Sequence, residues 1–306
     1  MPSEPDLVDR IRRYAADVPA RGAVLGIGDD CAIFRQPGSR EDLLFTTDLL
    51  IEDVHFRRES HPAADLGWKA LARGLSDIAA MGGEPRFCLI SLALALWAEP
   101  PWVDAFYRGL LRLARREQTP LLGGDLSRSA KTTCDIVVCG SVPRGKALRR
   151  DGAQPGNAIY VSGRLGGAAL GLSTGRGPAW KRHLHPEPRL KLGHFLRTGV
   201  RATAAMDLSD GLSLDLRRLC LASGCAAELT AIPGAAIFPG ATLEQALHGG
   251  EDYELLFTVP ARAAVPARFE GLPLTRLGTV RKGRPGAVLL GGAPLAPLGY
   301  DHFREG

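Results

Sequence analysis

The sequence predicts a two-domain α/β protein, on three observations. The chain has 306 residues, enough to bury a large core and long for a single domain. Short apolar runs typical of strands alternate with longer segments in which apolar residues recur at helical spacing. Residues 143–157 are rich in Arg, Gly and Pro and have no apolar periodicity. We therefore place the boundary there, between an N-terminal domain of residues 1–145 and a C-terminal domain of residues 146–306.

The first domain is expected to mix helices and strands. Leu7, Ile11 and Tyr14 share one face of the first predicted helix. A short apolar strand is expected to deliver Asp48 at its carboxyl end. The expected helices are 5–16, 61–81 and 101–116, and the expected extended segments are one ending at 26–28 and strands at 43–47, 86–96 and 134–142.

The second domain shows a further α/β pattern. The stretch 175–185 is the one internal segment whose composition is compatible with disorder. The expected strands are 158–162, 202–206 and 253–259, and the expected helices are 188–198, 211–222, 242–248 and one that starts at 166–172.

Composition excludes several classes of protein. The charge is +5 and the pI about 9.0, but the basic residues are dispersed, which suits an anionic small substrate better than a nucleic acid. The apolar stretch 87–98 is too short to cross a bilayer, and the N-terminus has no apolar signal, so we expect a cytoplasmic protein with no membrane partner. Six cysteines without a Cys-x-x-Cys pair are expected to be reduced and buried.

Aspartates next to Gly, Ser or Thr, at the ends of apolar runs, are the most informative feature. Carboxylates brought together would repel one another unless cations lay between them. The motifs therefore predict a site for several Mg²⁺ ions that holds a polyphosphate. They are Gly28-Asp29-Asp30, Thr46-Thr47-Asp48, Ser76-Asp77, Gly123-Gly124-Asp125 and Asp207-Leu208-Ser209-Asp210-Gly211.

Each motif also has an ordinary structural interpretation. Asp29 and Asp30 could form a simple Asx turn, and Ser209 or Asp210 could cap the helix that follows. Asp77 is the stronger functional candidate, because its neighbours are apolar and an unpaired carboxylate is unfavourable to bury.

Other polar residues suggest contacts with substrates. His55 could bind an anionic or polar group, although a lone histidine more often has no such role. Arg150 could neutralise a nucleotide phosphate, and Glu251 and Asp252 could recognise a cationic group. The sequence has neither a P-loop nor the motifs of protein kinases, so ATP would be held through metals and carboxylates.

Seven segments in order resemble thiamine-monophosphate kinases, a family related to aminoimidazole ribonucleotide synthetase and selenophosphate synthetase. The resemblance runs from Gly26 to Phe303. It departs from the usual pattern at Asp53, Gly74 and Leu126. The segments are GIGDDCAIF, TTDLLIEDVHF, GWKALARGLSDIAAMGG, LLGGDL, MDLSDGLSLDL, GGEDYELLFTV and GYDHF.

The resemblance implies a fold, a reaction and a set of site residues. The fold would be the two-domain fold of aminoimidazole ribonucleotide synthetase, in which the N-terminal sheets of two subunits form a barrel across a homodimer. Direct in-line transfer would convert ATP and thiamine monophosphate into ADP and thiamine diphosphate with Mg²⁺. The implied metal ligands are Asp30, Thr46, Thr47, Asp48, Asp77, Asp125, Asp207 and Asp210, with Asp48 and Asp210 as catalytic residues. The implied ATP contacts are Gly124, Asp125, Arg150 and Ser209, and the implied acceptor contacts are His55, Glu251, Asp252, Tyr300 and Phe303.

Two rival functions stay open on the sequence. A sibling synthetase would use ATP to activate a different small molecule. A regulatory protein would bind nucleotide or metal without turnover, although it would not need so complete a set of carboxylates.

Overall fold

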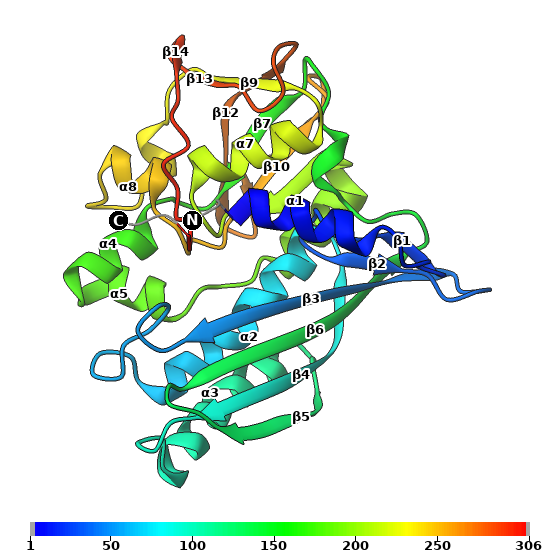
Figure 1. Cartoon of the computed structure of the whole chain (residues 1–306). Coiled ribbons are helices and arrows are strands. Elements are labelled where there is room, and N and C mark those ends of the chain that lie inside the picture. Colours follow the sequence, from blue (N-terminus) through cyan, green and yellow to red (C-terminus); the bar gives the residue numbers. More distant parts are fainter. Residues whose placement is uncertain (1–3, 304–306) are drawn as a thin grey trace.

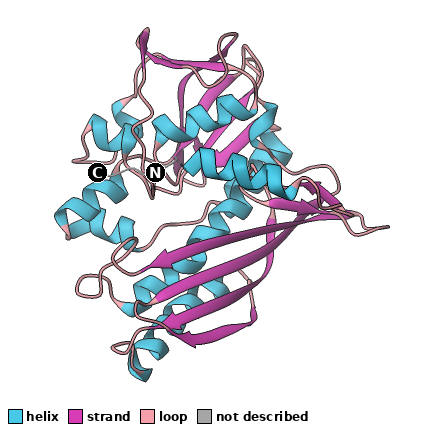
Figure 2. Ribbon diagram, viewed as in Figure 1, coloured by secondary structure: helices cyan, strands magenta, loops and turns pink. Residues whose placement is uncertain are grey.

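The computed structural model describes residues 4–303, which form two sheets with helices packed on them (Figures 1 and 2). The first sheet has the strand order β1-β2-β3-β6-β4-β5 and occupies the lower half of Figure 1. The second has the order β14-β13-β9-β12-β7-β10-β8, with β11 paired to β12. The mixed α/β fold that the sequence predicts is confirmed, whereas the domain boundary stays a prediction.

The N-terminal elements include the four long strands of the first sheet. They are α1 (Glu4–Ala15), β1 (Ala23–Leu25), β2 (Ala32–Phe34), β3 (Glu41–Ile51), α2 (Ala63–Ala80), β4 (Glu84–Leu94), α3 (Pro100–Arg116), β5 (Leu121–Arg128) and β6 (Thr133–Pro143).

The C-terminal elements build the second sheet and its helices. The helices are α4 (Gly167–Thr174), α5 (Gly177–Leu184), α6 (Leu190–Phe195), α7 (Leu212–Ala222) and α8 (Leu243–His248), with 3₁₀ turns at Arg150–Gly152 and Gly234–Ala236 and a π turn at Leu196–Val200. The strands are β7 (Ala158–Ser162), β8 (Ala204–Asp207), β9 (Ala226–Leu229), β10 (Leu255–Val259), β11 (Arg268–Phe269), β12 (Leu272–Arg281), β13 (Val288–Leu290) and β14 (Ala293–Pro294).

Helices α2 and α3 cover one face of the first sheet (Figure 1). They pack closely because glycines lie where they touch. A Cβ at Gly109 would stand 1.7 Å from the carbonyl oxygen of Ala64, and one at Gly67 would stand 1.9 Å from that of Phe106. Larger residues at either position would force the helices apart. This packing fixes α2, which carries Asp77, against the sheet.

Side chains alternate between the two faces of β3. Leu44, Thr46 and Leu50 are buried on the α2 side, whereas Thr47 and Leu49 are exposed on the opposite face. Figure 1 shows no helix across that opposite face of β3, β6, β4 and β5. The alternation therefore splits the Thr46-Thr47-Asp48 motif between two surfaces.

The two sheets share a hydrophobic core. One buried cluster combines Leu71 and Ile78 of α2 with Leu192 of α6 and Phe257 of β10. A second cluster lies between the larger sheet and α7, around Leu216 and Val280. Because α2 belongs to the shared cluster, its polar side chains are held against the second half of the molecule.

Several expectations about elements need correction. The strand expected at 43–47 extends over eleven residues, so Asp48 lies inside β3 rather than at its end. Gly123-Gly124-Asp125 lies within β5 and not in a turn. Residues 175–185 are not disordered, because most of them form α5, whose Ala179 and Leu184 are buried. Strands β9 and β12 were missing from the expected elements, although β12 pairs with both β7 and β9.

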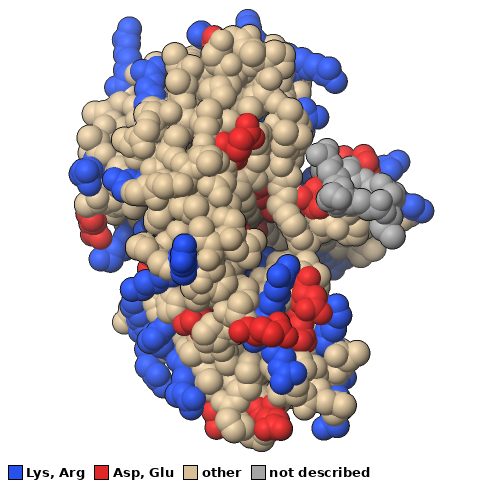
Figure 3. Space-filling view, turned by 90° about the vertical axis from the view of Figure 1, so that its left-hand side faces the viewer, with Lys and Arg blue, Asp and Glu red and all other residues tan. Residues whose placement is uncertain are grey.

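The surface agrees with the dispersed basic residues of the sequence. On the face shown in Figure 3, Lys and Arg side chains are spread over both halves and mixed with acidic ones. Among the helices described between residues 4 and 303, none has the length and apolar character needed to span a membrane.

Candidate functional site

A cavity of about 680 Å³ lies between the two halves of the molecule. Its walls come from distant parts of the chain: β3 and the loop after it, α2, the α4–α5 pair, the loop after β8, the loop before β10 and the C-terminal tail. The lining combines carboxylates with aromatic rings.

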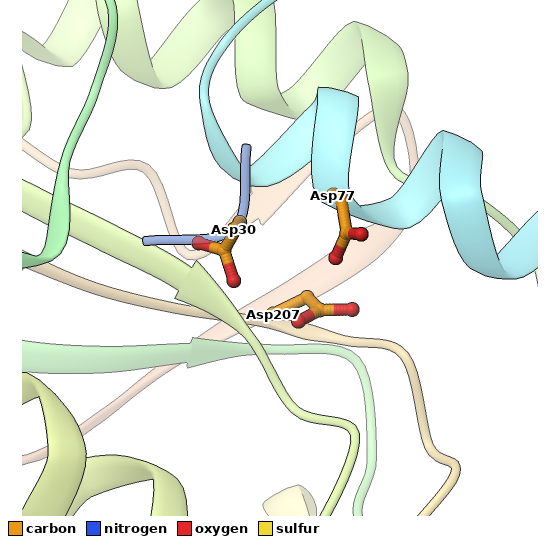
Figure 4. Close-up of side chains that lie close together, drawn as sticks. All are labelled: Asp30, Asp77 and Asp207. Carbon is orange, nitrogen blue, oxygen red and sulfur yellow. The ribbon is translucent and has the colours of Figure 1, made fainter. Parts of the chain in front are cut away.

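Three aspartates from three elements converge beside the cavity (Figure 4); Asp77 and Asp207 line it, whereas Asp30 lies outside its lining. Asp30 comes from the loop before β2, Asp77 from α2 and Asp207 from the end of β8. One oxygen of each lies within 4.8 Å of the others. We call these residues the aspartate cluster. Three of the five sequence motifs thus meet in space.

The carboxylates of the aspartate cluster are buried and repel one another. Burial, followed by the charges of Asp207, Asp48 and Asp30, raises the pKa of Asp77 well above its usual value. Burial and the charge of Asp30 do the same for the pKa of Asp207. Asp30 Oδ2 is buried without a hydrogen-bond partner among the described residues. Carboxylate oxygens with spare lone pairs suit a hard divalent cation, so this set fits Mg²⁺.

Hydroxyl groups hold two members of the aspartate cluster in place. Ser76 Oγ donates to Asp207 Oδ2 at 2.6 Å. Thr46 Oγ1 donates a short hydrogen bond to Asp77. Each of these hydrogen bonds uses only one oxygen of its carboxylate. The Ser76-Asp77 pair therefore contributes one carboxylate and one group that orients another.

Two further aspartates line the cavity, each paired with an arginine. Asp48 Oδ1 accepts from Arg73 Nη2 at 2.8 Å, and Asp210 forms a short ion pair with Arg218. Burial raises the pKa of Asp48, although Arg73 opposes the shift. These pairs place positive charge beside carboxylates at the edge of the aspartate cluster.

Arg150 lies beside the aspartate cluster. Its guanidinium forms a short ion pair with Asp30, and its backbone N–H donates to Asp29 Oδ2 at 3.1 Å. Burial, with the charge of Asp30, raises the pKa of Asp29 to about 6. Arg150 is thus within reach of any phosphate that the cluster holds.

Not all expected residues reach the cavity. Thr47 donates to Asp135 on the open face of the first sheet, at 2.5 Å. Gly124 and Asp125 are exposed on the edge strand β5, three strands from β3 and so about 14 Å away. A Cβ at Gly124 would stand 1.7 Å from the carbonyl oxygen of Ile90, so strand packing itself requires this glycine.

Aromatic rings form another part of the cavity wall. His55, Tyr300 and His302 line it, with ring centroids 5.0 Å apart for His55–His302 and 4.8 Å for Tyr300–His302. Burial, with the charge of Arg73, lowers the pKa of His55 to about 3. His55 Nδ1 accepts from the backbone N–H of Ile51, which leaves the proton of the neutral ring on Nε2.

Glu251 also lines the cavity, whereas two other expected acceptor contacts do not. Asp252 accepts from the backbone N–H groups of Gly166 and Ala168, at 2.5 and 3.0 Å. It is 2% exposed and caps the start of α4. Phe303 is 39% exposed and lies outside the cavity lining.

Sequence reasoning missed several groups of the site. Arg73 and Arg218 were not recognised, although Arg73 precedes Asp77 by four residues and so lies on the same helix face. His302 lies in the quoted tail segment but was passed over. Trp180 and His183 belong to α5, whose composition was compatible with disorder. Ser209 lines the cavity, and its expected contact with ATP stays a prediction.

Comparisons with known proteins identify the family of the chain. A family model described as AIR synthase related protein, N-terminal domain, matches residues 28–142. Thiamine-monophosphate kinase of Salmonella typhimurium is 38% identical, over 96% of this chain and 95% of its own length. The enzyme of the same name from Bacillus subtilis is 34% identical, over 92% and 94%.

Solved structures show the same likeness. AaThiL complexed with AMPPCP and TMP has a TM-score of 0.85 and 33% identity, covering 98% of this chain and 97% of that one. Thiamine-monophosphate kinase from Stenotrophomonas maltophilia has a TM-score of 0.75 and 37% identity, covering 94% and 96%. The chain belongs to the thiamine-monophosphate kinase family.

Proposed function

We propose that this protein transfers the γ-phosphoryl group of ATP directly to the phosphate of thiamine monophosphate. The observation that carries the proposal is that the wall of one cavity combines Asp77 and Asp207 of the aspartate cluster with aromatic rings. The carboxylates suit polyphosphate with divalent cations, and the rings suit a flat organic ring. The structure of AaThiL with an ATP analogue and TMP supports this choice of substrates.

We propose that Mg²⁺ binds the aspartate cluster, with Asp48 and Asp210 as further ligands at its edge. Bound there, the cations would supply charge neutralisation for the phosphate oxygens of both substrates. The carboxylates would then lose the mutual repulsion that raises the pKa values of Asp77 and Asp207. Thr46 serves this site by orienting Asp77.

The arginines and the neutral histidine define the rest of the mechanism. Arg73 and Arg150 would place positive charge near the two approaching phosphates. The acceptor phosphate is already anionic, so positioning matters more than removal of a proton. His55 would donate a hydrogen bond from Nε2 into the cavity, and Ser209 would contact ATP. No side chain is required to form a covalent intermediate.

We also propose a homodimer in which the open face of the first sheet meets the same face of a second copy. Leu49 and Leu122 are exposed there, by 47% and 64%. Exposed apolar side chains on an uncovered sheet are typical of an interface. Such pairing would close a barrel across the two subunits. It would also cover Asp125 at the sheet edge, so that the proposed contact of Asp125 with ATP would require the partner subunit. Cytoplasmic location is proposed with the same function.

Acceptor specificity tests the proposed reaction. Purified protein with Mg-ATP should release ADP and form thiamine diphosphate in equal amounts with thiamine monophosphate, and neither product with free thiamine. A chiral γ-phosphate should be inverted by a single in-line transfer. Retention would refute direct transfer, and turnover with free thiamine would refute the phosphate as acceptor.

A further inference from the structure

Helix α2 carries a lysine that the proposed reaction has not yet used. Lys69 is 0% exposed, and a buried ammonium group is strongly unfavourable unless it is paired. Its Nζ lies 2.9 Å from Glu251 Oε2 and 3.4 Å from His183 Nε2. The latter atom lies 3.2 Å from His61 Nε2. We call Lys69, Glu251, His183 and His61 the lysine cluster.

The lysine cluster carries one positive and one negative charge. Burial, with the charge of Lys69, lowers the pKa of His183 to about 3 and that of His61 to about 4, so both rings are neutral near pH 7. Burial works against the ionised form of Glu251, but Lys69, His183 and Arg73 outweigh it and lower its pKa to about 2. Lys69 and Glu251 therefore form an ion pair.

Only the carboxylate of this ion pair faces the cavity. Glu251 lines the cavity wall, and Lys69 lies behind it. The backbone of Glu251 is left-handed, with φ of 66°, and its N–H donates to the carbonyl oxygen of Ser209 at 2.7 Å. The loop after β8 thus sets the backbone of Glu251, and α2 sets its side chain. Such a conformation persists only where its surroundings hold it.

The two cations of α2 lie one turn apart and pair with different carboxylates of the cavity wall. Arg73 pairs with Asp48, whereas Lys69 pairs with Glu251. We propose that Lys69 is a positioning residue for the phosphate acceptor, holding the Glu251 carboxylate where the cationic ring of thiamine monophosphate meets it. This inference rests on the proposed function.

Three variants test this role: Lys69→Met, Glu251→Gln and the double variant. KM for thiamine monophosphate, KM for Mg-ATP and kcat are measured, together with acceptor binding by calorimetry without ATP. Glu251→Gln and Lys69→Met should each raise the Kd and KM for the acceptor about tenfold or more, with KM for Mg-ATP within about twofold. Lys191→Met, at a lysine whose side chain is 79% exposed, is the control and should change neither.

The double variant decides the outcome even if Lys69→Met alone fails to fold, because it leaves no uncompensated charge. If Lys69 acts through Glu251, the double variant should bind the acceptor no more than about twofold more weakly than Glu251→Gln. A further tenfold loss, or normal acceptor affinity in Glu251→Gln, would overturn the inference. A wild type without acceptor-dependent turnover would instead refute the proposed function.

Discussion

At the scale of single residues, the site brings together charged groups whose proximity is unfavourable unless a ligand is bound. Asp77 and Asp207 are carboxylates placed side by side in a buried position, with raised pKa values. Ion pairs with nearby arginines compensate the charges of Asp30, Asp48 and Asp210. Asp77 and Asp207 have no such ion pair among the described residues. The aspartate cluster therefore favours ligand binding at the expense of the stability of the unliganded fold.

The substitution Asp77→Asn should stabilise the protein in EDTA by about 1–3 kcal/mol, because it removes one of three crowded negative charges and keeps the hydrogen bond from Thr46. It should also abolish turnover. Urea unfolding with EDTA measures the first effect. Asp104→Asn, on the exposed side of α3, is the control, with an expected change below about 0.5 kcal/mol. A destabilised Asp77→Asn protein would contradict the description of the cluster.

His302 and Phe303 are neighbours with different expected effects. His302→Ala should raise KM for thiamine monophosphate several-fold, because its ring packs against His55 and Tyr300 in the cavity. Phe303→Ala should leave KM unchanged, since Phe303 lies outside the cavity lining. Steady-state kinetics of both variants distinguish the two tail residues, and the reverse order of effects would assign acceptor contact to Phe303.

At the scale of elements, the site depends on the position of α2. This helix supplies Lys69, Arg73 and Asp77 at four-residue spacing, and it is held between the first sheet, α3 and α6. Its approach to α3 requires glycine at two positions. Rigid placement of a helix that carries several charged groups preorganises the cavity.

Gly109→Ala should therefore destabilise the fold by about 2 kcal/mol or more, because the added methyl group would overlap the carbonyl of Ala64. Gly26→Ala is the matched control, since a Cβ there has nothing within 4 Å and should cost less than about 0.5 kcal/mol. Thermal unfolding of the two variants compares them. Equal stability would show that α2 and α3 can separate without loss.

The comparison of sequence and structure shows which features local patterns determine. Helices such as α2 and α3 are predicted by the spacing of their apolar residues. Asp77 was recognisable because its neighbours are apolar and an unpaired carboxylate is unfavourable to bury. The extent of β3 did not follow, because Asp48 interrupts the apolar run and aspartate is depleted in strand interiors. The partners Arg218 and His183 depend on tertiary contacts that no local pattern reports. Trp180 was not recognised as a cavity residue because the composition of its segment is polar.

At the scale of the whole molecule, two sheets enclose one cavity and leave one sheet face open. The cavity needs both halves, because Asp77 comes from the first and Asp207 from the second. The open face bears the exposed apolar side chains of Leu49 and Leu122. Catalysis and assembly are therefore assigned to different surfaces of the first sheet.

Leu122→Glu should convert the proposed homodimer to monomer, because it would bury a charge at the edge of the open face. Leu243→Glu, at a residue 47% exposed on α8, should leave the assembly unchanged. Light scattering after gel filtration gives the mass of each variant. A wild type that is monomeric at micromolar concentration, or a Leu122→Glu dimer, would refute the proposed interface.

The most direct test of the proposed kinase is product stoichiometry in the wild type and in Asp207→Asn. Wild-type protein with Mg-ATP and thiamine monophosphate should form ADP and thiamine diphosphate one to one, and no product after EDTA. Folded Asp207→Asn should lose at least about a hundredfold in kcat, because the aspartate cluster would be incomplete. ADP release that does not depend on thiamine monophosphate, or full activity in Asp207→Asn, would contradict a kinase built on this cluster.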